Sequence, residues 1–338
     1  MGAWGMIFDR LGRELHDLRI SATDRCNLRC TFCMPEGQYY EFFKQEEILS
    51  FEEITKFVKA IIPLGIKKVR LTGGEPLLRK NLEKLIKMLS ELPIEDLSLT
   101  TNGFLLKEKA EALKLAGLKR ITVSLPSLKD EVFSRIVGRE VKVSSILEGI
   151  EEALRVGLKP VKVNVCVVRG LNDGEIVDIA KFFKGMGVVV RFIEFMDVGN
   201  LNGWSLDKVF SVKQMLQLLK EHLELEPVEK SYRGEVAERY RYTDDGVEVG
   251  FISSITQPFC GDCNRLRLTA DGKVLTCLFA QGGYDVKSLI RSGAGEEEIR
   301  KFILDIWYQR EDRYSEKRLE MLKKGIKPQK VEMFKIGG

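Results

Sequence analysis

The sequence lacks the features of a membrane or secreted protein. No apolar run approaches the roughly 18 residues that a membrane-spanning helix requires. The amino-terminal segment, residues 1–6, has no hydrophobic stretch of a signal peptide, and Met6 stands where a myristoylation signal would place Ser or Thr. We therefore expect a cytoplasmic protein without a membrane partner, whose cysteines stay reduced.

The sequence also has little net charge and few histidines. The 54 basic and 50 acidic residues give a net charge of +4, so no broad basic face is expected and nucleic acid is excluded as a partner. The only two histidines, His16 and His222, have no partner at metal-ligand spacing, which predicts structural roles for both. A hydrophobic fraction of 44% in 338 residues is that of a globular chain with one or two domains.

Cysteine is present in two groups of three. Cys26, Cys30 and Cys33 follow the pattern C-x3-C-x2-C among polar residues. Three thiolates can hold three irons of a [4Fe–4S] cluster and leave the fourth iron open to bind and polarise a small molecule. The alternatives are a zinc knot, which would need another Cys or His nearby, and buried core thiols, which would stand in an apolar run.

The second group is Cys260, Cys263 and Cys277, with the pattern C-x2-C-x13-C. Asp271-Gly272 predicts a hairpin turn, which places Cys277 on the far arm and favours a second three-thiolate cluster. A zinc half-site or a redox pair is the alternative. The seventh cysteine, Cys166, stands alone in an apolar strand and is predicted to be a small residue of a cavity wall.

Strand and helix patterns alternate through the first part of the chain. A helix begins at the capping box Ser50-Phe51-Glu52-Glu53. Six strands are expected at 15–22, 68–72, 97–100, 121–125, 161–167 and 188–195. Six parallel βα units predict an α/β fold, a partial (βα)6 TIM-like barrel, over residues 1–196.

The alternation ends after residue 196. Helices are expected at 211–222, 286–291 and 296–311, and antiparallel strands at 232–242 and 247–254. We therefore predict a second module over residues 197–338, an α+β extension that carries the second iron–sulfur site.

The strands of the predicted barrel have one apolar and one polar face. If the apolar face packs on the helices, the inward set is Arg19, Ser21, Arg70, Thr72, Ser98, Thr100, Thr122, Ser124, Lys162, Asn164 and Cys166. Arg265 and Arg267, on a strand after the second cysteine pair, point the same way as each other. Such a lining predicts a wet, cationic cavity for an anionic ligand. The alternative is that these cations face solvent on an exposed sheet.

Taken together, the motifs resemble a known family. They are the two cysteine groups, Thr72-Gly73-Gly74-Glu75-Pro76, the run Phe192-Ile193-Glu194-Phe195-Met196, residues 259–267 and the terminal Gly337-Gly338. This set is similar to that of the GTP 3′,8-cyclases, radical S-adenosylmethionine enzymes that open molybdenum cofactor biosynthesis. The resemblance covers nearly the whole chain.

The resemblance implies a lyase with two [4Fe–4S] clusters and S-adenosyl-L-methionine as cofactors and GTP as substrate. The first cluster (Cys26, Cys30, Cys33) would cleave S-adenosylmethionine, and the resulting 5′-deoxyadenosyl radical would take hydrogen from C3′ of GTP. Attack on C8 of guanine would then give 3′,8-cyclo-7,8-dihydro-GTP. The second cluster (Cys260, Cys263, Cys277) would offer its open iron to the guanine.

The resemblance also assigns binding residues. Those that match the family's S-adenosylmethionine contacts are Phe32, Gly74, Ser124 and Met196. Those that match its GTP contacts are Arg19, Arg70, Thr101, Lys162, Arg265, Leu266 and Arg267. Gly337 and Gly338 would reach into the active site, where a terminal Gly-Gly alone would suggest a frayed tail. Two positions depart from the family: Pro126 replaces a usual aspartate, and Phe32 replaces a usual tyrosine.

Further partners follow from the resemblance. They are an unidentified electron donor and the next enzyme of the pathway, which would receive the cyclised product; the sequence leaves the oligomeric state open, a homodimer included. Two rival functions remain. A radical peptide maturase with an auxiliary cluster would usually carry more cysteines in the carboxyl-terminal module. An electron-transfer iron–sulfur protein would need neither a cationic cavity nor open irons.

Overall fold

The computed structural model describes residues 5–338; residues 1–4, part of the amino-terminal segment considered above, lie outside the described residues. Its central feature is one twelve-stranded sheet, ordered β12-β11-β10-β1-β2-β3-β4-β5-β6-β9-β8-β7. The first six strands are β1 (Asp17–Ser21), β2 (Lys68–Thr72), β3 (Asp96–Thr101), β4 (Arg120–Ser124), β5 (Val161–Val167) and β6 (Val189–Glu194). They are parallel and in sequence order, as predicted.

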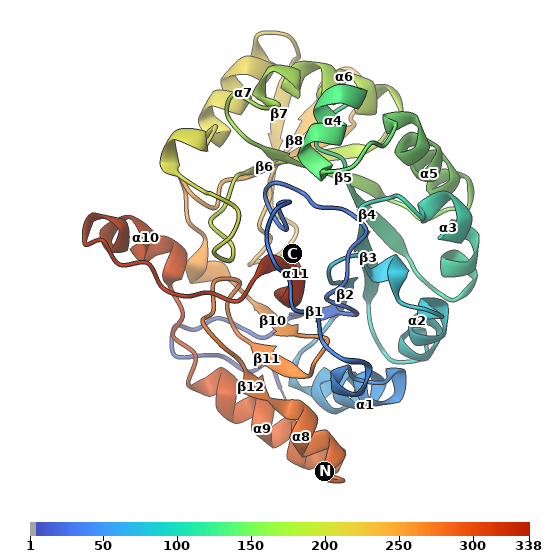
Figure 1. Cartoon of the computed structure of the whole chain (residues 1–338), viewed down its shortest axis with the longest axis vertical. Coiled ribbons are helices and arrows are strands. Elements are labelled where there is room, and N and C mark those ends of the chain that lie inside the picture. Colours follow the sequence, from blue (N-terminus) through green and yellow to red (C-terminus); the bar gives the residue numbers. More distant parts are fainter. Residues whose placement is uncertain (1–4) are drawn as a thin grey trace.

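Helices form a ring outside these strands (Figure 1). They are α1 (Phe51–Ile61), α2 (Leu82–Ser90), α3 (Leu106–Leu115), α4 (Asp130–Val137), α5 (Val143–Arg155) and α6 (Ile176–Gly185). The capping box at α1 is present, because the Ser50 hydroxyl accepts from the Glu53 amide at 3.1 Å and the Glu53 carboxylate accepts from the Ser50 amide at 2.7 Å. The partial barrel is therefore confirmed.

The strands after residue 196 extend this sheet at both ends. They are β7 (Leu225–Val228), β8 (Glu238–Tyr242), β9 (Glu248–Ile252), β10 (Arg265–Leu268), β11 (Lys273–Leu275) and β12 (Tyr284–Asp285). β9 pairs in parallel with β6, and β10 pairs in parallel with β1. β8 and β9 form the predicted antiparallel pair. The division into modules at residues 196 and 197 stays a prediction, because the later strands share the barrel's own sheet.

The remaining helices are α7 (Val212–Lys220), α8 (Val286–Arg291), α9 (Glu296–Tyr308), α10 (Tyr314–Lys323) and α11 (Met333–Ile336). α9 packs beside α1 on the outside of the ring, whereas α10 projects from it and α11 lies at its centre with the carboxyl terminus (Figure 1). None of the helices in residues 5–338 is long and apolar enough to cross a membrane.

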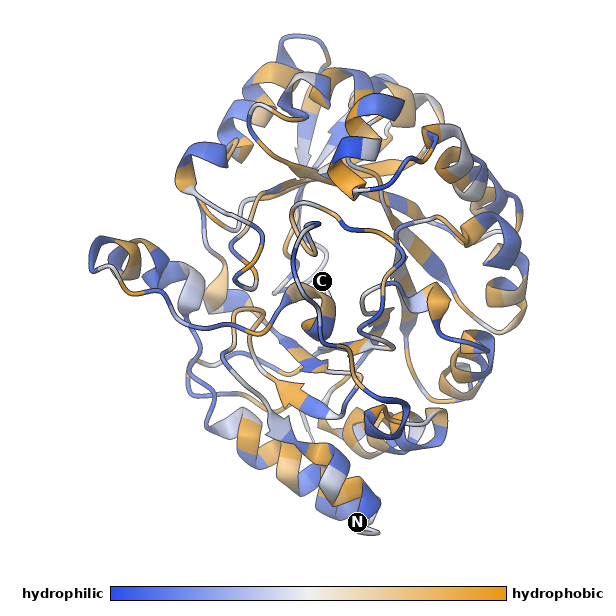
Figure 2. Cartoon of the chain, in the orientation of Figure 1, coloured by the Kyte–Doolittle hydropathy of each residue, from blue (hydrophilic) through white to orange (hydrophobic). Residues whose placement is uncertain are grey.

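The two faces of the barrel strands divide as expected. The outward apolar set is fully buried in the main core against the helices; it consists of Leu18, Ile20, Val69, Leu71, Leu97, Leu99, Ile121, Val123, Leu125, Val161, Val163 and Val165. The helices of the ring carry both hydrophobic and hydrophilic bands, as amphipathic helices do (Figure 2). The sheet is thus free to present polar side chains on its inner face.

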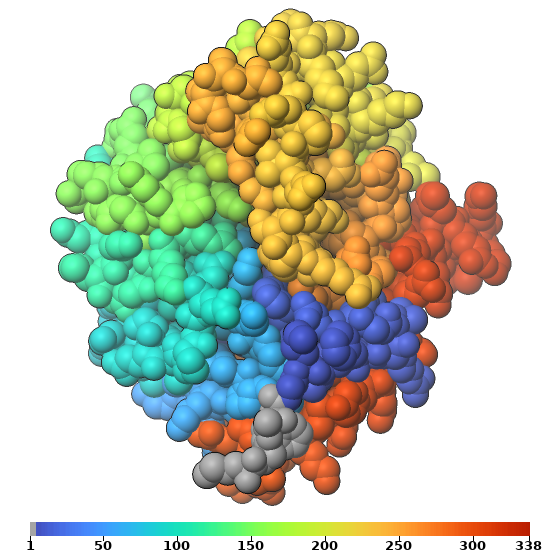
Figure 3. Space-filling view, turned by 180° about the vertical axis from the view of Figure 1, so that it is seen from behind, coloured from blue at the N-terminus to red at the C-terminus, as the bar shows by residue number. Residues whose placement is uncertain are grey.

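The back of the barrel is covered by a later segment of the chain. Seen from behind, the residues around β7 and β8 cross the molecule beside the amino-terminal residues (Figure 3). From this segment Tyr232, Glu235 and Arg239 line the internal cavity. The cavity is therefore bounded on this side by residues far along the chain from the strands it closes.

Candidate functional site

A cavity of about 320 Å³ lies inside the barrel, within the size range of small-molecule sites, about 300–1,000 Å³. Most of the predicted inward residues line it: Arg19, Arg70, Ser98, Thr100, Ser124, Lys162, Asn164 and Cys166. Arg265 and Arg267 line it too, from β10. The solvent-exposed alternative for these cations is therefore wrong, since the strands that carry them turn this face inward.

The cavity concentrates positive charge. Burial, with repulsion from Arg191, Arg120 and Arg70, lowers the pKa of Lys162 to about 7. Burial, with repulsion from Arg19, likewise lowers the pKa of the Arg70 guanidinium well below its usual value. These shifts measure the cost of holding several cations together without a counter-anion, and a polyanion would remove that cost.

Two guanidinium nitrogens in the cavity wall are unpaired. Nη1 of Arg120 and Nη2 of Arg265 are buried and have no hydrogen-bond partner among the described residues. The side chains of Arg70 and Lys162 likewise form no hydrogen bond or ion pair with any residue in the described range. Buried donors without partners are rare in folded proteins, and an anionic ligand would satisfy them.

The first cysteine group lies in the loop after β1. Two glycines let the end of β2 approach this loop closely: a Cβ on Gly74 would lie 2.3 Å from the Arg25 carbonyl oxygen, and one on Gly73 would lie 2.5 Å from that of Thr23. The loop also pairs with the end of α4, because the Arg29 amide donates to the Val137 carbonyl at 2.8 Å. The backbone around the thiols is thus fixed from two sides.

The first three thiols are close enough for their charges to interact. Burial raises the pKa of Cys33 well above its ordinary value, and the charges of Cys30 and Cys26 raise it further. Burial likewise raises the pKa of Cys166 to about 12, and its charge would act on Cys30. Cys166 lies in the cavity wall, as predicted. Thiols in such a setting become thiolates when a metal neutralises them.

The second group surrounds the other side of the cavity, and all three members line it: Cys260, Cys263 and Cys277. Cys277 follows β11, on the far arm of the predicted hairpin. Burial raises the pKa of the Cys263 thiol, but Arg265 and Arg310 outweigh burial and lower it to about 6. The first group lies next to the same cavity, since Phe32 of its loop lines it, as does Cys166, whose charge would act on Cys30.

Two buried arginines support the second group from behind. Arg310 donates to the Cys263 carbonyl at 2.7 Å and to the Thr276 carbonyl at 3.0 Å. Arg13 donates to the Cys260 carbonyl at 2.8 Å. Asp9 pairs with both guanidinium groups, at 2.6 Å and 3.1 Å. The three cysteine positions are thus held by a single hydrogen-bonded cluster.

Both groups offer the donor set that an iron–sulfur cluster takes, three free thiols each. Among residues 5–338, no three His, Cys, Asp or Glu side chains come close enough together to bind one ion. A zinc ion needs its donors at about 2.0–2.3 Å from one point, whereas a cubane takes each thiolate on a different iron. All seven cysteines are free thiols, so both groups remain available as ligands.

Two of the four residues predicted to contact S-adenosylmethionine, Phe32 and Gly74, lie in or against the first cysteine loop. Phe32, Ser124 and Met196 line the cavity, and Gly74 packs on the cysteine loop. Pro126, the departure from the family pattern, lines the cavity as well. The role of these residues in binding S-adenosylmethionine stays a prediction.

Two of the residues predicted to contact GTP do not face the cavity. The Leu266 side chain is fully buried in the main core, because it alternates with Arg265 and Arg267 along β10. The Thr101 hydroxyl donates to Glu75 at 2.6 Å and supports that carboxylate instead. The geometry therefore gives no support to a side-chain contact with GTP from either residue.

The residues of the cavity wall that were not predicted include Lys68, Arg120, Arg191 and Tyr232. Arg191 could have been found, because it lies two residues from Val189 and from Ile193 on β6 and therefore shares their cavity-lining face. Tyr232 could not, since it comes from the segment that covers the back of the barrel. It stacks on His16, with ring centroids 5.0 Å apart, so His16 has a packing role as predicted.

The terminal glycines lie in the cavity and not in a frayed tail. Arg19 donates to a terminal oxygen of Gly338 at 3.0 Å, and Arg267 donates to the Gly337 carbonyl. Gly337 has a φ of +76°, and a Cβ there would lie 2.5 Å from the Thr72 methyl group. Both the dihedral angle and the close approach therefore require glycine.

Comparisons with known proteins now bear on this site. Residues 20–183 match the radical SAM superfamily model, and residues 188–316 match the Molybdenum Cofactor Synthesis C model. The chain is 47% identical to the GTP 3′,8-cyclase of Staphylococcus epidermidis over 98% of this chain and 99% of the relative. It belongs to the GTP 3′,8-cyclase family. The Staphylococcus aureus member is 46% identical, again over 98% of this chain and 99% of the relative.

Solved structures confirm the fold. The crystal structure of Streptococcus suis SuiB bound to S-adenosylmethionine aligns with a TM-score of 0.63 and 16% identity, over 87% of this chain and 65% of that one. At this identity the likeness concerns the fold alone. Membership of the radical SAM superfamily supports S-adenosylmethionine and one iron–sulfur cluster as cofactors.

Proposed function

We propose that this protein is a lyase that converts GTP to 3′,8-cyclo-7,8-dihydro-GTP with S-adenosylmethionine as cofactor, in the first step of molybdenum cofactor biosynthesis. The observation that carries the proposal is a cationic cavity lined by the three thiols of the second group and by Phe32 from the loop of the first group. A nucleoside triphosphate matches it, since its phosphates are a polyanion and its base and ribose need a less charged region.

The proposed binding mode divides the cavity by charge. Arg19, Arg70, Lys162, Arg265 and Arg267 would hold the phosphate oxygens, and the free guanidinium nitrogen of Arg265 would gain a partner. Phe32, Ser124, Met196 and the backbone at Gly74 would hold S-adenosylmethionine beside the first thiols. Fixing both molecules in one enclosed space would bring the ribose close to the cofactor.

Cys26, Cys30 and Cys33 would hold one [4Fe–4S] cluster, and Cys260, Cys263 and Cys277 a second. When bound, the first cluster supplies the electron that cleaves S-adenosylmethionine. The chain would supply three thiolate ligands to each cluster and leave the fourth iron of each without a protein ligand, since no fourth cysteine or histidine lies in either group.

Turnover tests the proposal directly. Reduced, cluster-replete protein incubated with S-adenosylmethionine and GTP should consume both and release 5′-deoxyadenosine. The absence of 5′-deoxyadenosine above a GTP-free background would reject the cyclase function.

Metal content tests the second cluster separately. Anaerobically purified protein should contain about eight iron atoms, and a Cys277→Ser variant should approach about four. Zinc in place of iron, or about four irons in the unmodified protein, would reject the second cluster while leaving a radical enzyme possible.

The remaining partners are part of the same proposal. We infer a cytoplasmic, reducing location from the seven free thiols. An electron donor must reduce the first cluster, and the next enzyme of the pathway must receive the product. A homodimer is compatible with the chain and is tested by sedimentation.

A further inference from the structure

The carboxyl-terminal tail, residues 324–338, connects α10 with the cavity, which Gly338 lines. It leaves the end of α10, which projects from the barrel, and α11 brings the last residues to the centre (Figure 1). There Gly337 and Gly338 meet Arg267 and Arg19. Something must fix the tail along this path, because chain termini without anchors are usually mobile.

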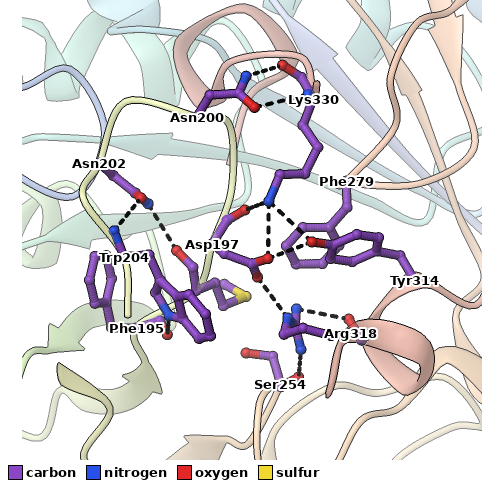
Figure 4. Close-up of polar contacts among 12 residues, drawn as sticks. Phe195, Asp197, Asn200, Asn202, Trp204, Ser254, Phe279, Tyr314, Arg318 and Lys330 are labelled. Atoms are coloured by element: carbon purple, nitrogen blue, oxygen red, sulfur yellow. Dashed lines mark hydrogen bonds and ion pairs between the residues drawn. The ribbon is translucent and has the colours of Figure 1, made fainter. Parts of the chain in front are cut away.

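Asp197 provides such an anchor. Its carboxylate accepts hydrogen bonds from Tyr314 Oη at 2.6 Å, from Arg318 Nε at 2.7 Å and from Lys330 Nζ at 3.0 Å (Figure 4). The Lys330 ammonium also donates to the Asp197 carbonyl. The side chains of Asp197, Arg318 and Lys330 are only 10%, 1% and 7% exposed. Lys330 belongs to the tail, so this buried cluster joins the tail to the loop after β6.

A second attachment lies next to the first. The Asn200 amide group donates to the Lys330 carbonyl at 2.6 Å and accepts from the Lys330 amide at 3.1 Å. It also donates to the Glu332 carboxylate at 2.8 Å. Gly199 makes this approach possible, since a Cβ there would lie 2.2 Å from that carboxylate. The tail is therefore fixed on both sides of Val331.

The same cluster contacts the loop of the second cysteine group. Phe279, two residues after Cys277, stacks on Tyr314 with ring centroids 4.7 Å apart, and the Arg318 guanidinium lies 4.9 Å from the Phe279 ring centroid. The Val331 amide donates to the Ala280 carbonyl at 2.9 Å. On the other side, Met196 precedes Asp197 and lines the cavity. Three segments of the cavity wall thus meet at one carboxylate.

Burying these charged groups together is an inefficient way to stabilise a fold, because each ion loses its hydration. Two buried cations share one carboxylate, and apolar side chains of similar size would usually stabilise a fold as well or better. A fully hydrogen-bonded polar cluster does define one arrangement of its parts, because any shift leaves a buried charge unpaired. The cluster is therefore suited to setting the position of the tail.

We propose that Asp197 is a positioning residue that, with Lys330 and Asn200, holds the tail so that Gly337 and Gly338 meet Arg267 and Arg19. We call these three residues the tail clasp. The clasp acts from outside the cavity, since none of its three residues lines the cavity. Its effect on turnover rests on the proposed function, but its effect on the tail does not.

Hydrogen exchange of the ligand-free protein tests the clasp without any cofactor. In Lys330→Met, the amides of Val331, Lys335, Ile336 and Gly337 should exchange about tenfold faster or more, the factor expected from losing a hydrogen bond to a charged group. Exchange in β3 should not change. Asp197→Asn should act in the same way, and combining the two substitutions should add little, because each breaks the same contact.

Controls separate the clasp from general destabilisation. Asp244→Asn removes an exposed partner of Lys184, at 2.9 Å, and should leave exchange of the tail unchanged. Lys330→Met keeps the Arg318–Asp197 pair, so it tests the clasp even if Asp197→Asn does not fold. Asn200→Ala should give a smaller increase, since it removes two neutral bonds to the Lys330 backbone and one exposed bond to the Glu332 carboxylate.

Kinetics test whether the position of the tail matters. The tail uses one nitrogen each of Arg19 and Arg267, so the other guanidinium nitrogens remain able to bind phosphate. Lys330→Met should therefore lower kcat about tenfold while the Kd for GTP changes by less than about threefold. Unchanged exchange of the tail, or faster exchange without loss of kcat, would overturn the proposal. If the unmodified protein makes no product, the proposed cyclase function is rejected. Hydrogen exchange of the tail amides then still tests whether the clasp holds the tail.

Discussion

At the scale of single residues, the cavity is defined by a cluster of cations on its wall. Arg265 and Arg267 follow each other at period two on β10 and both line the cavity, while Leu266 between them is buried. A short strand thus delivers two guanidinium groups to one face. This geometry is what a bound triphosphate would use.

Removing either arginine should weaken GTP binding. We expect Arg265→Ala or Arg267→Ala to raise the Kd for GTP roughly tenfold to a hundredfold, the range for a lost hydrogen bond to a charged group. Isothermal titration with cluster-replete protein measures this, and the iron content should not change. The matched control is Arg233→Ala, an exposed arginine paired with Asp262 at 3.1 Å, which should bind GTP normally. Unchanged affinity in both variants would contradict the proposed role.

Lys162 should make GTP binding dependent on pH. Its pKa of about 7 in the free protein means that it loses its proton as the pH rises above neutrality. Phosphate binding favours the charged form, so the complex takes up a proton and affinity falls by up to about tenfold per pH unit above pH 7. Titration calorimetry in buffers of different ionisation enthalpy measures the uptake. In Lys162→Met this uptake should vanish; its persistence would assign the proton to another group.

At the scale of elements, the first cysteine loop depends on how closely β2 approaches it. The amide of Gly74 donates to the Thr23 carbonyl at 2.8 Å, and that of Glu75 donates to the Arg25 carbonyl at 2.8 Å. These bonds form only because residues 73 and 74 carry no side chain. The glycines are therefore required for packing, whatever else they contact.

A single methyl group should displace this loop. Gly74→Ala places a Cβ 2.3 Å from the Arg25 carbonyl oxygen, which something in the loop must relieve at a cost of about 1–3 kcal/mol. We expect a lower melting temperature and loss of about half the iron of the unmodified protein. Gly185→Ala, where no atom lies within 4 Å, is the control and should retain both. Full iron content in Gly74→Ala would show that the loop adapts without losing its ligand positions.

At the scale of the whole molecule, the later strands complete the sheet of the barrel. β10 covers the outer edge of β1, and β9 covers that of β6. Leu266, Leu268, Val249 and Phe251 from these strands are buried in the same core as the barrel strands. The predicted division at residue 196 would cut through this shared core.

A fragment of residues 1–196 should therefore not fold independently. It would expose the edges of β1 and β6 together with part of the core, which favours aggregation. We expect a fragment that elutes as aggregates in size-exclusion chromatography and lacks near-ultraviolet circular dichroism. A monomeric fragment with a cooperative unfolding transition would support an autonomous domain at the predicted boundary instead.

Much of the fold could be read from local patterns. The period-two strands, the capping box at Ser50 and the Asp271-Gly272 turn all lie within a few residues of their effects, and each is present as predicted. The residues of β1 to β5 that face the barrel interior were predicted from the same two-residue repeat. Leu266 shows the limit of a family resemblance, because the period of β10 alone turns it away from the cavity.

The sequence by itself determined the six-stranded barrel, the two groups of three cysteines and the cationic inner face, since these depend on spacing within short segments. Only the tertiary structure decided that β10 lies beside β1, that Tyr232 closes the back of the cavity and that Asp197 meets Lys330. The residues in each of these contacts are separated by more than a hundred positions in the chain. No periodicity records such contacts, because they form only when the packed sheet brings distant segments into register.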